Sequence, residues 1–364
     1  MILNKRNTLR TLGQTALVAG TGVFFSQGSN AKLSRDQLRA GLARFRGQSL
    51  VVASWGGLYA EAQRKALYQP FQDEFGVRII EDAPALNPRI AAMVKSGNVT
   101  WDACSIGGYK AEALGLEGLL EPVDYNVIDS RNFVRQYVGR FGTAFMNYGM
   151  VLAYRSDVLK DSQPTSVKDL WDLKRFPGMR GLEDDPVSTL PFALQAAGVP
   201  KKDIYPLNEE KIRMAFAKLD EIKKQVIWWK QSAQAPQLLA SREVVMTQAF
   251  NGRLDQLLSE GLPIKIVWDG AHLLFDSWCF PKGSKSKELA MLFVAWASQP
   301  ENNVRFGNFI TYGPTNSEAI PMVKKERAAA MPTSYLSEMV VIDSEWWGAN
   351  WTRLVDRFNT WRLT

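Results

Sequence analysis

Short apolar runs alternate with amphipathic stretches along most of the chain, beginning at about residue 48. Apolar runs of five or six residues predict buried strands, whereas apolar positions three or four apart predict helices. The first half predicts strands over 49–54, 77–81 and 101–106, and helices over 59–74, 88–96 and 110–117. This alternation is typical of βαβ units and of a parallel sheet.

A second series of the same kind follows a long β-prone run over 143–154. It predicts strands over 179–183, 244–249 and 264–268, and helices over 189–197, 209–224, 251–260 and 287–298. The residues 273–281 read as a second extended connection that leads back to the first series. Two extended connections without a Gly/Ser spacer indicate two α/β lobes joined by a pair of strands.

Glycine turns with an adjacent aromatic residue follow two of the predicted strands. Trp55-Gly56-Gly57 ends the first strand, and Gly107-Gly108-Tyr109 ends the third. Ligands of open α/β sheets bind outside the carboxyl ends of the strands, and glycine lets backbone approach a ligand closely. Motifs for dinucleotide, P-loop, serine hydrolase and HExxH zinc sites do not occur, so these turns predict another kind of binding site.

The first 31 residues differ in composition from the rest of the chain. They contain Lys5, Arg6 and Arg10, no acidic residue and a short apolar run from Gly13 to Phe25, which is the arrangement of a secretory signal peptide. The run is shorter than the ~20 residues that cross a bilayer. We expect export to the periplasm by the Sec or the twin-arginine route, the latter a weak match with Lys in place of the first Arg, and no membrane-spanning segment.

The net charge, the single histidine and the two cysteines of the chain disfavour several further classes of function. Without the three basic residues of the leader, the net charge falls from +7 to about +4 and is interspersed, so nucleic acid is not an expected partner. The single His272, expected in a turn, disfavours histidine triads and metal sites, and we expect no cofactor. Cys104 and Cys279 are either a disulfide of an exported protein or two buried thiols.

Seven segments, taken in order, resemble the extracellular solute-binding proteins of ABC importers, of the spermidine/putrescine-binding type. They are SWGGLYAEA, WDACSIGGY, EGLLEPVDY, LEDDP, QAFNGRLDQLLSEG, DGAHLLFDSWCFPKGSKSKELA and YGPTN. The resemblance implies a two-lobed periplasmic binding protein fold of type II, in which each lobe is a mixed sheet flanked by helices and two extended hinge strands join the lobes. It divides the chain into a signal peptide (1–31), lobe 1 (45–145 and 276–320), lobe 2 (146–275) and C-terminal helices (321–364).

The resemblance also implies a ligand site in the cleft between the lobes. The residues that match its amine site are Trp55, Tyr109, Asp185, Phe250, Asp276 and Tyr312. An alkyl ammonium needs a carboxylate for its charge and aromatic faces for its methylenes, so this combination suits a small amine whatever the family.

Two departures from the family pattern favour a ligand smaller than spermidine. Ser188 stands where spermidine binders carry a further carboxylate, and Leu274 stands where they carry a second Trp. We expect either putrescine or a zwitterion like 4-aminobutyrate, whose carboxylate could meet the Gly56-Gly57 or Gly107-Gly108 amides or Arg180.

The expected partners are this small amine and an inner-membrane ABC permease, and the expected state is a monomer without enzymatic activity. Two other functions stay open from the sequence. One is an exported carboxylate-dependent enzyme, a lyase or glycosidase, using the acids at 183–185 together with Asp276, whose mark would be raised carboxyl pKa values in a cleft. The other is a ligand sensor that docks on a receptor.

Overall fold

The computed structural model describes residues 32–160 and 162–364, so the predicted signal peptide lies outside the described residues. The strands are β1 (Ser49–Ala53), β2 (Arg78–Asp82), β3 (Ala103–Gly107), β4 (Leu120–Glu121), β5 (Thr143–Arg155), β6 (Arg180–Glu183), β7 (Val226–Trp229), β8 (Met246–Phe250), β9 (Ile264–Pro281), β10 (Gly313–Pro314) and β11 (Val340–Val341). The helices are α1 (Arg35–Ala43), α2 (Gly57–Gln63), α3 (Gln69–Phe75), α4 (Asn87–Ser96), α5 (Gly108–Leu116), α6 (Pro186–Ala196), α7 (Glu209–Asp220), α8 (Gln234–Ala240), α9 (Asp255–Ser259), α10 (Lys287–Ala297), α11 (Pro300–Asn303), α12 (Lys325–Ala328) and α13 (Ser344–Leu363).

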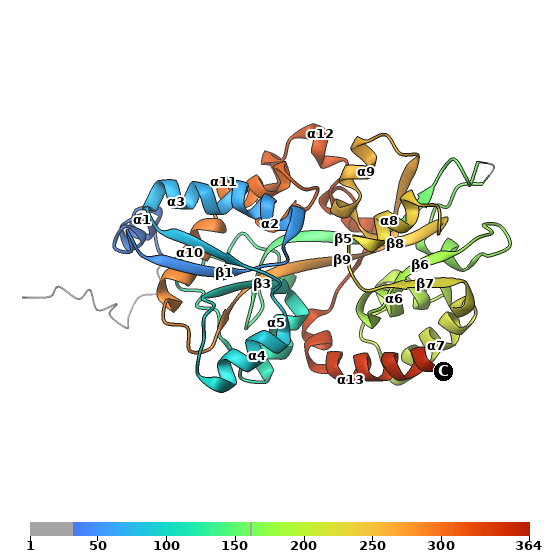
Figure 1. Cartoon of the computed structure of the whole chain (residues 1–364), viewed down its shortest axis with the longest axis horizontal. Coiled ribbons are helices and arrows are strands. Elements are labelled where there is room, and N and C mark those ends of the chain that lie inside the picture. The colour runs from blue at the N-terminus through green and yellow to red at the C-terminus, as the bar shows by residue number, and fades with distance from the viewer. Residues whose placement is uncertain (1–31, 161) are drawn as a thin grey trace, which may run out of the picture. The chain divides into compact units, whose positions relative to one another are not determined.

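A mixed sheet runs through the structure in the order β2-β1-β3-β9-β5-β8-β6-β7. The pairs β1–β2, β1–β3, β6–β7 and β6–β8 are parallel, as the βαβ pattern predicts. The long strands β5 and β9 pair antiparallel at the centre and join the two parallel halves (Figure 1). The predicted mixed α/β fold class is therefore confirmed.

The predicted second connection is wrong in one respect, because β9 is a single strand from Ile264 to Pro281 rather than a strand, a break and a connection. Asp269-Gly270, between the two predicted segments, lies in a bulge, where the register against β5 shifts and Gly270 has φ +80°. His272 consequently lies inside the sheet and not in a turn. It is fully buried, and its Nε2 lies 2.9 Å from the Tyr205 hydroxyl.

The structure also differs from the prediction in the end of one helix and in elements that the hydrophobic pattern did not predict. The helix predicted over 209–224 ends at Asp220, because a short 3-10 turn intervenes before β7. Strand β7, which the sequence analysis did not predict, contains Trp228 and Trp229. Helix α1 precedes the predicted alternation; its N-terminus is a capping box in which Ser34 and Gln37 each accept from the other's backbone N–H.

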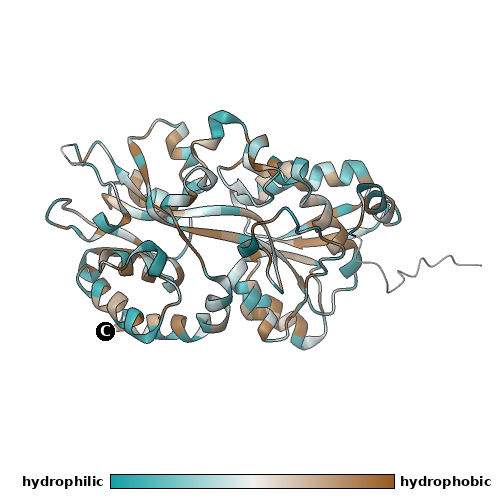
Figure 2. Cartoon of the chain, turned by 180° about the vertical axis from the view of Figure 1, so that it is seen from behind, coloured by the Kyte–Doolittle hydropathy of each residue, from teal (hydrophilic) through white to brown (hydrophobic). Residues whose placement is uncertain are grey.

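Hydrophobic side chains pack into separate clusters around the two halves of the sheet. One cluster packs β1 and β3 against α2, α3 and α10, and a second packs the same strands against α4 and α5. A third gathers β5 to β8 with α6, α7 and α13. Figure 2 shows this pattern as hydrophobic residues along the central strands and mixed residues along the helices.

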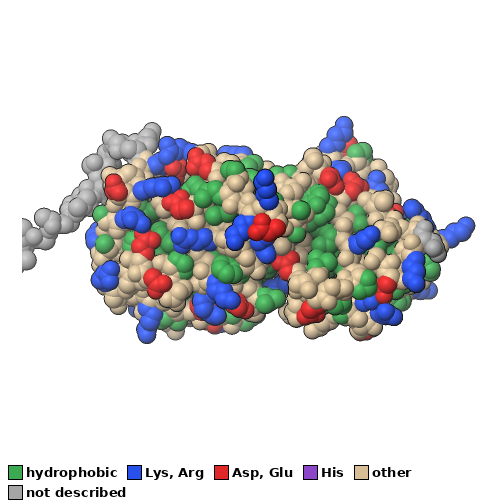
Figure 3. Space-filling view, turned by 90° about the horizontal axis from the view of Figure 1, so that it is seen from above, with side chains coloured by type: hydrophobic (Ala, Val, Ile, Leu, Met, Phe, Trp, Pro, Cys, Tyr) green, Lys and Arg blue, Asp and Glu red, His purple; other side chains and the backbone are tan. Residues whose placement is uncertain are grey.

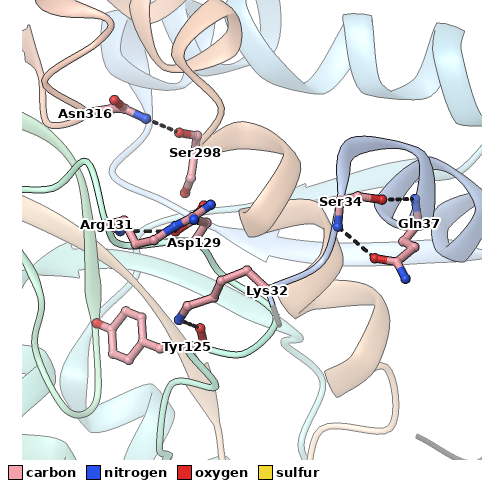
Figure 4. Close-up of polar contacts among 8 residues, drawn as sticks. All are labelled: Lys32, Ser34, Gln37, Tyr125, Asp129, Arg131, Ser298 and Asn316. Atoms are coloured by element: carbon pink, nitrogen blue, oxygen red, sulfur yellow. Dashed lines mark hydrogen bonds and ion pairs between the residues drawn. The ribbon is translucent and has the colours of Figure 1, made fainter. Parts of the chain in front are cut away.

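Polar contacts fix the segment where the described chain begins. Lys32 donates from its ammonium to the carbonyl of Tyr125, and Asp129 and Arg131 of the same loop pair with each other (Figure 4). Asn316 donates to the carbonyl of Ser298 at 3.0 Å in the same region. The contact of Lys32 with Tyr125 holds the approach to α1 against the loop 124–131.

Basic and acidic side chains are intermixed over the face shown in Figure 3, as the charge pattern of the sequence predicts. Within the described residues, no helix combines the length and the apolar character needed to cross a membrane.

Candidate functional site

A cavity of about 530 Å³ lies where the carboxyl ends of strands from both halves of the sheet meet. Trp55 follows β1, Tyr109 and Lys110 open α5 after β3, and the acidic turn 183–185 follows β6. Phe250 ends β8, and residues 230–232 follow β7. Strand ends are where open α/β sheets place their ligands, so this cavity is the candidate site.

All six residues that the sequence selected line this one cavity. They are Trp55, Tyr109, Asp185, Phe250, Asp276 and Tyr312. They come from six separate elements or loops spread over more than 250 residues of sequence. The convergence is a fact of the geometry, whereas the binding role of each residue stays a prediction.

Aromatic rings form much of the cavity wall. Tyr148 of β5 contacts Phe250 edge to face at 5.3 Å between ring centroids and Tyr312 at 5.4 Å. Tyr312 in turn packs on Gly252, where a Cβ would come within 2.6 Å of the Tyr312 ring. Only glycine permits this contact, which brings the segment of Arg253 against the aromatic wall. Burial raises the pKa of the Tyr59, Tyr109, Tyr148 and Tyr312 hydroxyls, so all four are neutral donors at neutral pH.

Asp276 on β9 is a buried carboxylate held by three neutral donors. Trp55 Nε1 and the Tyr59 hydroxyl each donate to its Oδ2 at 2.7 Å, and the Tyr148 hydroxyl donates to its Oδ1 at 3.2 Å. Burial raises the pKa of Asp276, and these three hydrogen bonds offset part of that rise. A carboxylate has about four acceptor positions, so one position on Oδ1 is left for a donor in the cavity.

The acidic turn after β6 contains three carboxyls in different environments. Asp185 caps α6 by accepting from the Val187 N–H at 2.8 Å, and burial raises its pKa. Burial, and then the charge of Asp185, raise the pKa of Glu183 to about 8, so Glu183 is mostly protonated at neutral pH. Asp184 is paired with Arg362 at 3.0 Å and with Lys230 at 3.6 Å.

Two basic residues line the cavity without an ion pair to any described residue. Arg253 follows β8, and its Nε is buried without a hydrogen-bond partner among residues 32–160 and 162–364. Lys110 lies with its ammonium over the rings of Trp55 and Tyr109. The charge of Lys110 lowers the pKa of both Asp276 and Asp185. These two carboxyls and the two cations Lys110 and Arg253 all line the cavity without an ion pair to any described residue, and their charges balance.

Arg180, which the sequence offered as a partner for a ligand carboxylate, does not line the cavity. It is fully buried and donates to the carbonyls of Leu170, Gly178 and Phe176. Burial lowers its pKa to about 10. Arg180 is therefore a structural residue that ties the loop before β6 to the sheet.

The sequence analysis missed four cavity residues that carry chemistry: Tyr59, Lys110, Tyr148 and Arg253. Glu183 was considered only as an acid of the alternative enzyme function. Tyr59 and Lys110 lie within four residues of the two glycine turns, so proximity to these turns was an available signal for both. Tyr148 lies on a predicted strand, and Arg253 lies three residues after Phe250. Ser188 and Leu274, the two departures from the family pattern, are buried outside the cavity lining.

Cys104 and Cys279 face each other across β3 and β9 as directly paired residues, and both are free, buried thiols. Among the residues that the structure describes, no group of three or more His, Cys, Asp and Glu could hold a metal ion.

Comparison with known proteins identifies the type of protein that contains such a cavity. Residues 66–333 match the pattern that defines the bacterial extracellular solute-binding proteins. A gamma-aminobutyric acid-binding protein of Pseudomonas aeruginosa is 35% identical over 328 residues, which are 88% of this chain and 93% of that protein.

Solved structures support the same assignment. A GABA receptor has a TM-score of 0.80 at 31% identity, covering 86% of this chain and 97% of the receptor. A spermidine/putrescine-binding protein of Streptococcus pneumoniae has a TM-score of 0.68 at 20% identity, covering 87% of this chain and all of that one. At that identity the second similarity shows the fold alone, so the finer resemblance to the spermidine/putrescine type stays a prediction.

Proposed function

The chain belongs to the bacterial extracellular solute-binding proteins, and on that premise we propose that it binds a small zwitterion like 4-aminobutyrate and delivers it to an ABC permease. The ligand ammonium pairs with Asp276, and the ligand carboxylate pairs with Arg253. The protein acts as a monomer in the periplasm, and its two lobes close over the ligand about β5 and β9.

The observation that carries this proposal is Arg253, which lines the same cavity as Asp276, makes no ion pair with the described residues and has a buried Nε without a hydrogen-bond partner among them. A guanidinium presents a rigid fork of donors that matches a carboxylate, and a buried N–H donor such as the Arg253 Nε is costly without an acceptor. A ligand carboxylate would satisfy it. A diamine offers no such group and would add two positive charges to a cavity whose own charges already balance.

Tyr148 and Tyr312 suit the middle of such a ligand. Their rings lie 5.4 Å apart and form one wall of the cavity with Phe250. Each buried methylene contributes about 0.8 kcal/mol, so three methylenes add roughly 2.4 kcal/mol to two charged contacts. Micromolar affinity requires about 8 kcal/mol, which two desolvated ion pairs and this wall can supply.

The relatives favour the zwitterion over the diamine. The Pseudomonas protein and the GABA receptor, both above 30% identity, are named for gamma-aminobutyric acid. The polyamine-binding relative stands at 20% identity.

An exported enzyme is the second candidate, because the raised pKa of Glu183 is the mark that carboxylate catalysis would carry. Isothermal titration calorimetry with 4-aminobutyrate, putrescine and spermidine, followed by product analysis, separates the two functions. We expect one-to-one binding of 4-aminobutyrate, weaker binding of both polyamines and recovery of the ligand unchanged. Tighter binding of putrescine than of 4-aminobutyrate, or a new product, would contradict the proposal.

A further inference from the structure

We propose that Lys110 is a specificity residue that excludes diamines, because its own ammonium occupies the place that a second ligand ammonium would need. The inference rests on the proposed function, since it concerns the ligand class of the same cavity.

Three aromatic rings surround the Lys110 ammonium. Its Nζ lies 5.4 Å from the ring centroid of Trp55, 5.5 Å from that of Tyr109 and 5.7 Å from that of Trp351. A cation within about 6 Å of an aromatic face is attracted by the ring, and several such faces together form the cage by which proteins bind alkyl ammonium groups. Lys110 thus fills an ammonium site with a group of the protein itself.

The third ring of this cage comes from the C-terminal helix. Trp351 lies on α13 and contacts Tyr109 edge to face, with 6.0 Å between ring centroids. Helix α13 packs along α5, which carries Tyr109 and Lys110, and also contacts α6 (Figure 1). The cage is therefore built from the turn after β1, from α5 and from α13.

The cage faces the carboxyls of the cavity. Lys110 lines the same cavity as Glu183, Asp185 and Asp276, and its charge lowers the pKa of all three. Yet no carboxylate oxygen of residues 32–160 or 162–364 lies within 4.0 Å of it. The ammonium is held by the rings and stands a short way from the acidic turn, as a ligand ammonium in an aromatic cage would.

This arrangement discriminates by charge. One ligand ammonium can pair with Asp276, but a second ammonium directed toward the acidic turn meets the like charge of Lys110. Like charges in a partly desolvated site repel strongly, so a diamine is disfavoured while a zwitterion is not. Without the Lys110 charge, the three rings and the carboxyls of Glu183 and Asp185 would form an empty site for that second ammonium.

The test compares Lys110→Met with the unaltered protein by isothermal titration calorimetry against putrescine and 4-aminobutyrate. Methionine keeps an unbranched apolar side chain that reaches as far as the lysine Cε, and it removes the charged ammonium group. We expect Lys110→Met to bind putrescine at least about tenfold more tightly, a gain of ~1.4 kcal/mol. Lys110→Arg keeps the charge and is expected to keep the exclusion.

Lys65→Met is the matched control, because Lys65 also lies over an aromatic ring, that of Phe309 at 5.9 Å, but outside the cavity lining. It should leave the putrescine affinity unchanged. Thermal denaturation checks that each variant is folded, and Lys110→Gln replaces Lys110→Met if the latter does not fold.

Two results would overturn the inference. One is an unchanged or weaker putrescine affinity in the folded Lys110→Met protein. The other is a loss of 4-aminobutyrate binding with no gain for putrescine, which would make Lys110 the partner of the ligand carboxylate. The proposed function is judged separately, by whether the unaltered protein binds 4-aminobutyrate at all.

Discussion

Replacing Asp276 by Asn tests the charge of the cavity without changing its shape. The carboxylate is 3% exposed and accepts from Trp55, Tyr59 and Tyr148. The Asn amide can keep its oxygen toward Trp55 and Tyr59, since both donate to the same Oδ2, and turn its NH2 toward Tyr148, whose hydroxyl can accept. The hydrogen bonds of the folded state therefore survive in large part.

Stability and affinity should respond differently to this substitution. Removing a buried charge that no cation pairs directly relieves desolvation, so we expect the stability to change by no more than about 1 kcal/mol. Losing the charge partner of a ligand ammonium costs about 2–5 kcal/mol, which weakens binding by at least about thirtyfold.

Calorimetry with 4-aminobutyrate measures the affinity, and thermal denaturation measures the stability. Glu112→Gln is the control, because Glu112 is a buried carboxyl that accepts from the Phe141 N–H and does not line the cavity. A folded Asp276→Asn protein that binds 4-aminobutyrate within threefold of the unaltered protein would refute the assignment of Asp276 as the ammonium partner.

Three further predictions concern pH and thiol chemistry. The folded-state pKa of Glu183, about 8, exceeds its value of 4.5 in the unfolded chain, so its contribution to stability is lost as the pH rises from about 4.5 to 8. Glu183→Gln should therefore raise the melting temperature at pH 8.5 and leave it nearly unchanged at pH 4.5. Equal effects at the two pH values would contradict this. Burial lowers the pKa of His272 from 6.5 to about 3, so stability is lost as the pH falls from 6.5 toward 3. In denaturant titrations, the free energy of unfolding of His272→Gln should fall less on acidification than that of the unaltered protein. An identical decrease in the two proteins would rule out His272 as the cause. Cys104 and Cys279 are fully buried, and burial raises the pKa of the Cys104 thiol. Ellman's reagent should therefore detect no thiol in the native protein and two thiols after unfolding in guanidinium. Detection of no thiol after unfolding would show a disulfide instead.

The sequence was most informative where local chemistry and topology coincide. Glycine turns at strand ends identified Trp55 and Tyr109, because the carboxyl edge of a parallel sheet follows from the order of the elements alone. The same reasoning gave the alternating fold and the paired strands at its centre. Asp276 lies on one of these strands, β9, where it pairs with residues of β3 and β5.

The roles of the basic residues could not be predicted in the same way. Among 44 Lys and Arg residues, the sequence does not show which lose their carboxylate partners on folding. The sequence offered Arg180 as a partner for a ligand carboxylate, but its guanidinium donates its hydrogen bonds to backbone carbonyls. Arg253 and Lys110 line the cavity, and the sequence analysis missed both. Trp55 was expected as a ligand wall, but its indole N–H also holds Asp276, a role that only the tertiary contact reveals.

His272 illustrates a limit of a different kind. Asp269-Gly270 has the composition of a turn, yet the strand continues through it because a bulge absorbs the extra residues. Pairing with β5 on one side and β11 on the other outweighs the local preference of the two residues.

A crystal structure of the complex with 4-aminobutyrate tests the central claim most directly. The account predicts the ligand ammonium at the free position of Asp276 Oδ1 and the ligand carboxylate on Arg253. A ligand bound in the reverse orientation, or bound outside this cavity, would contradict it.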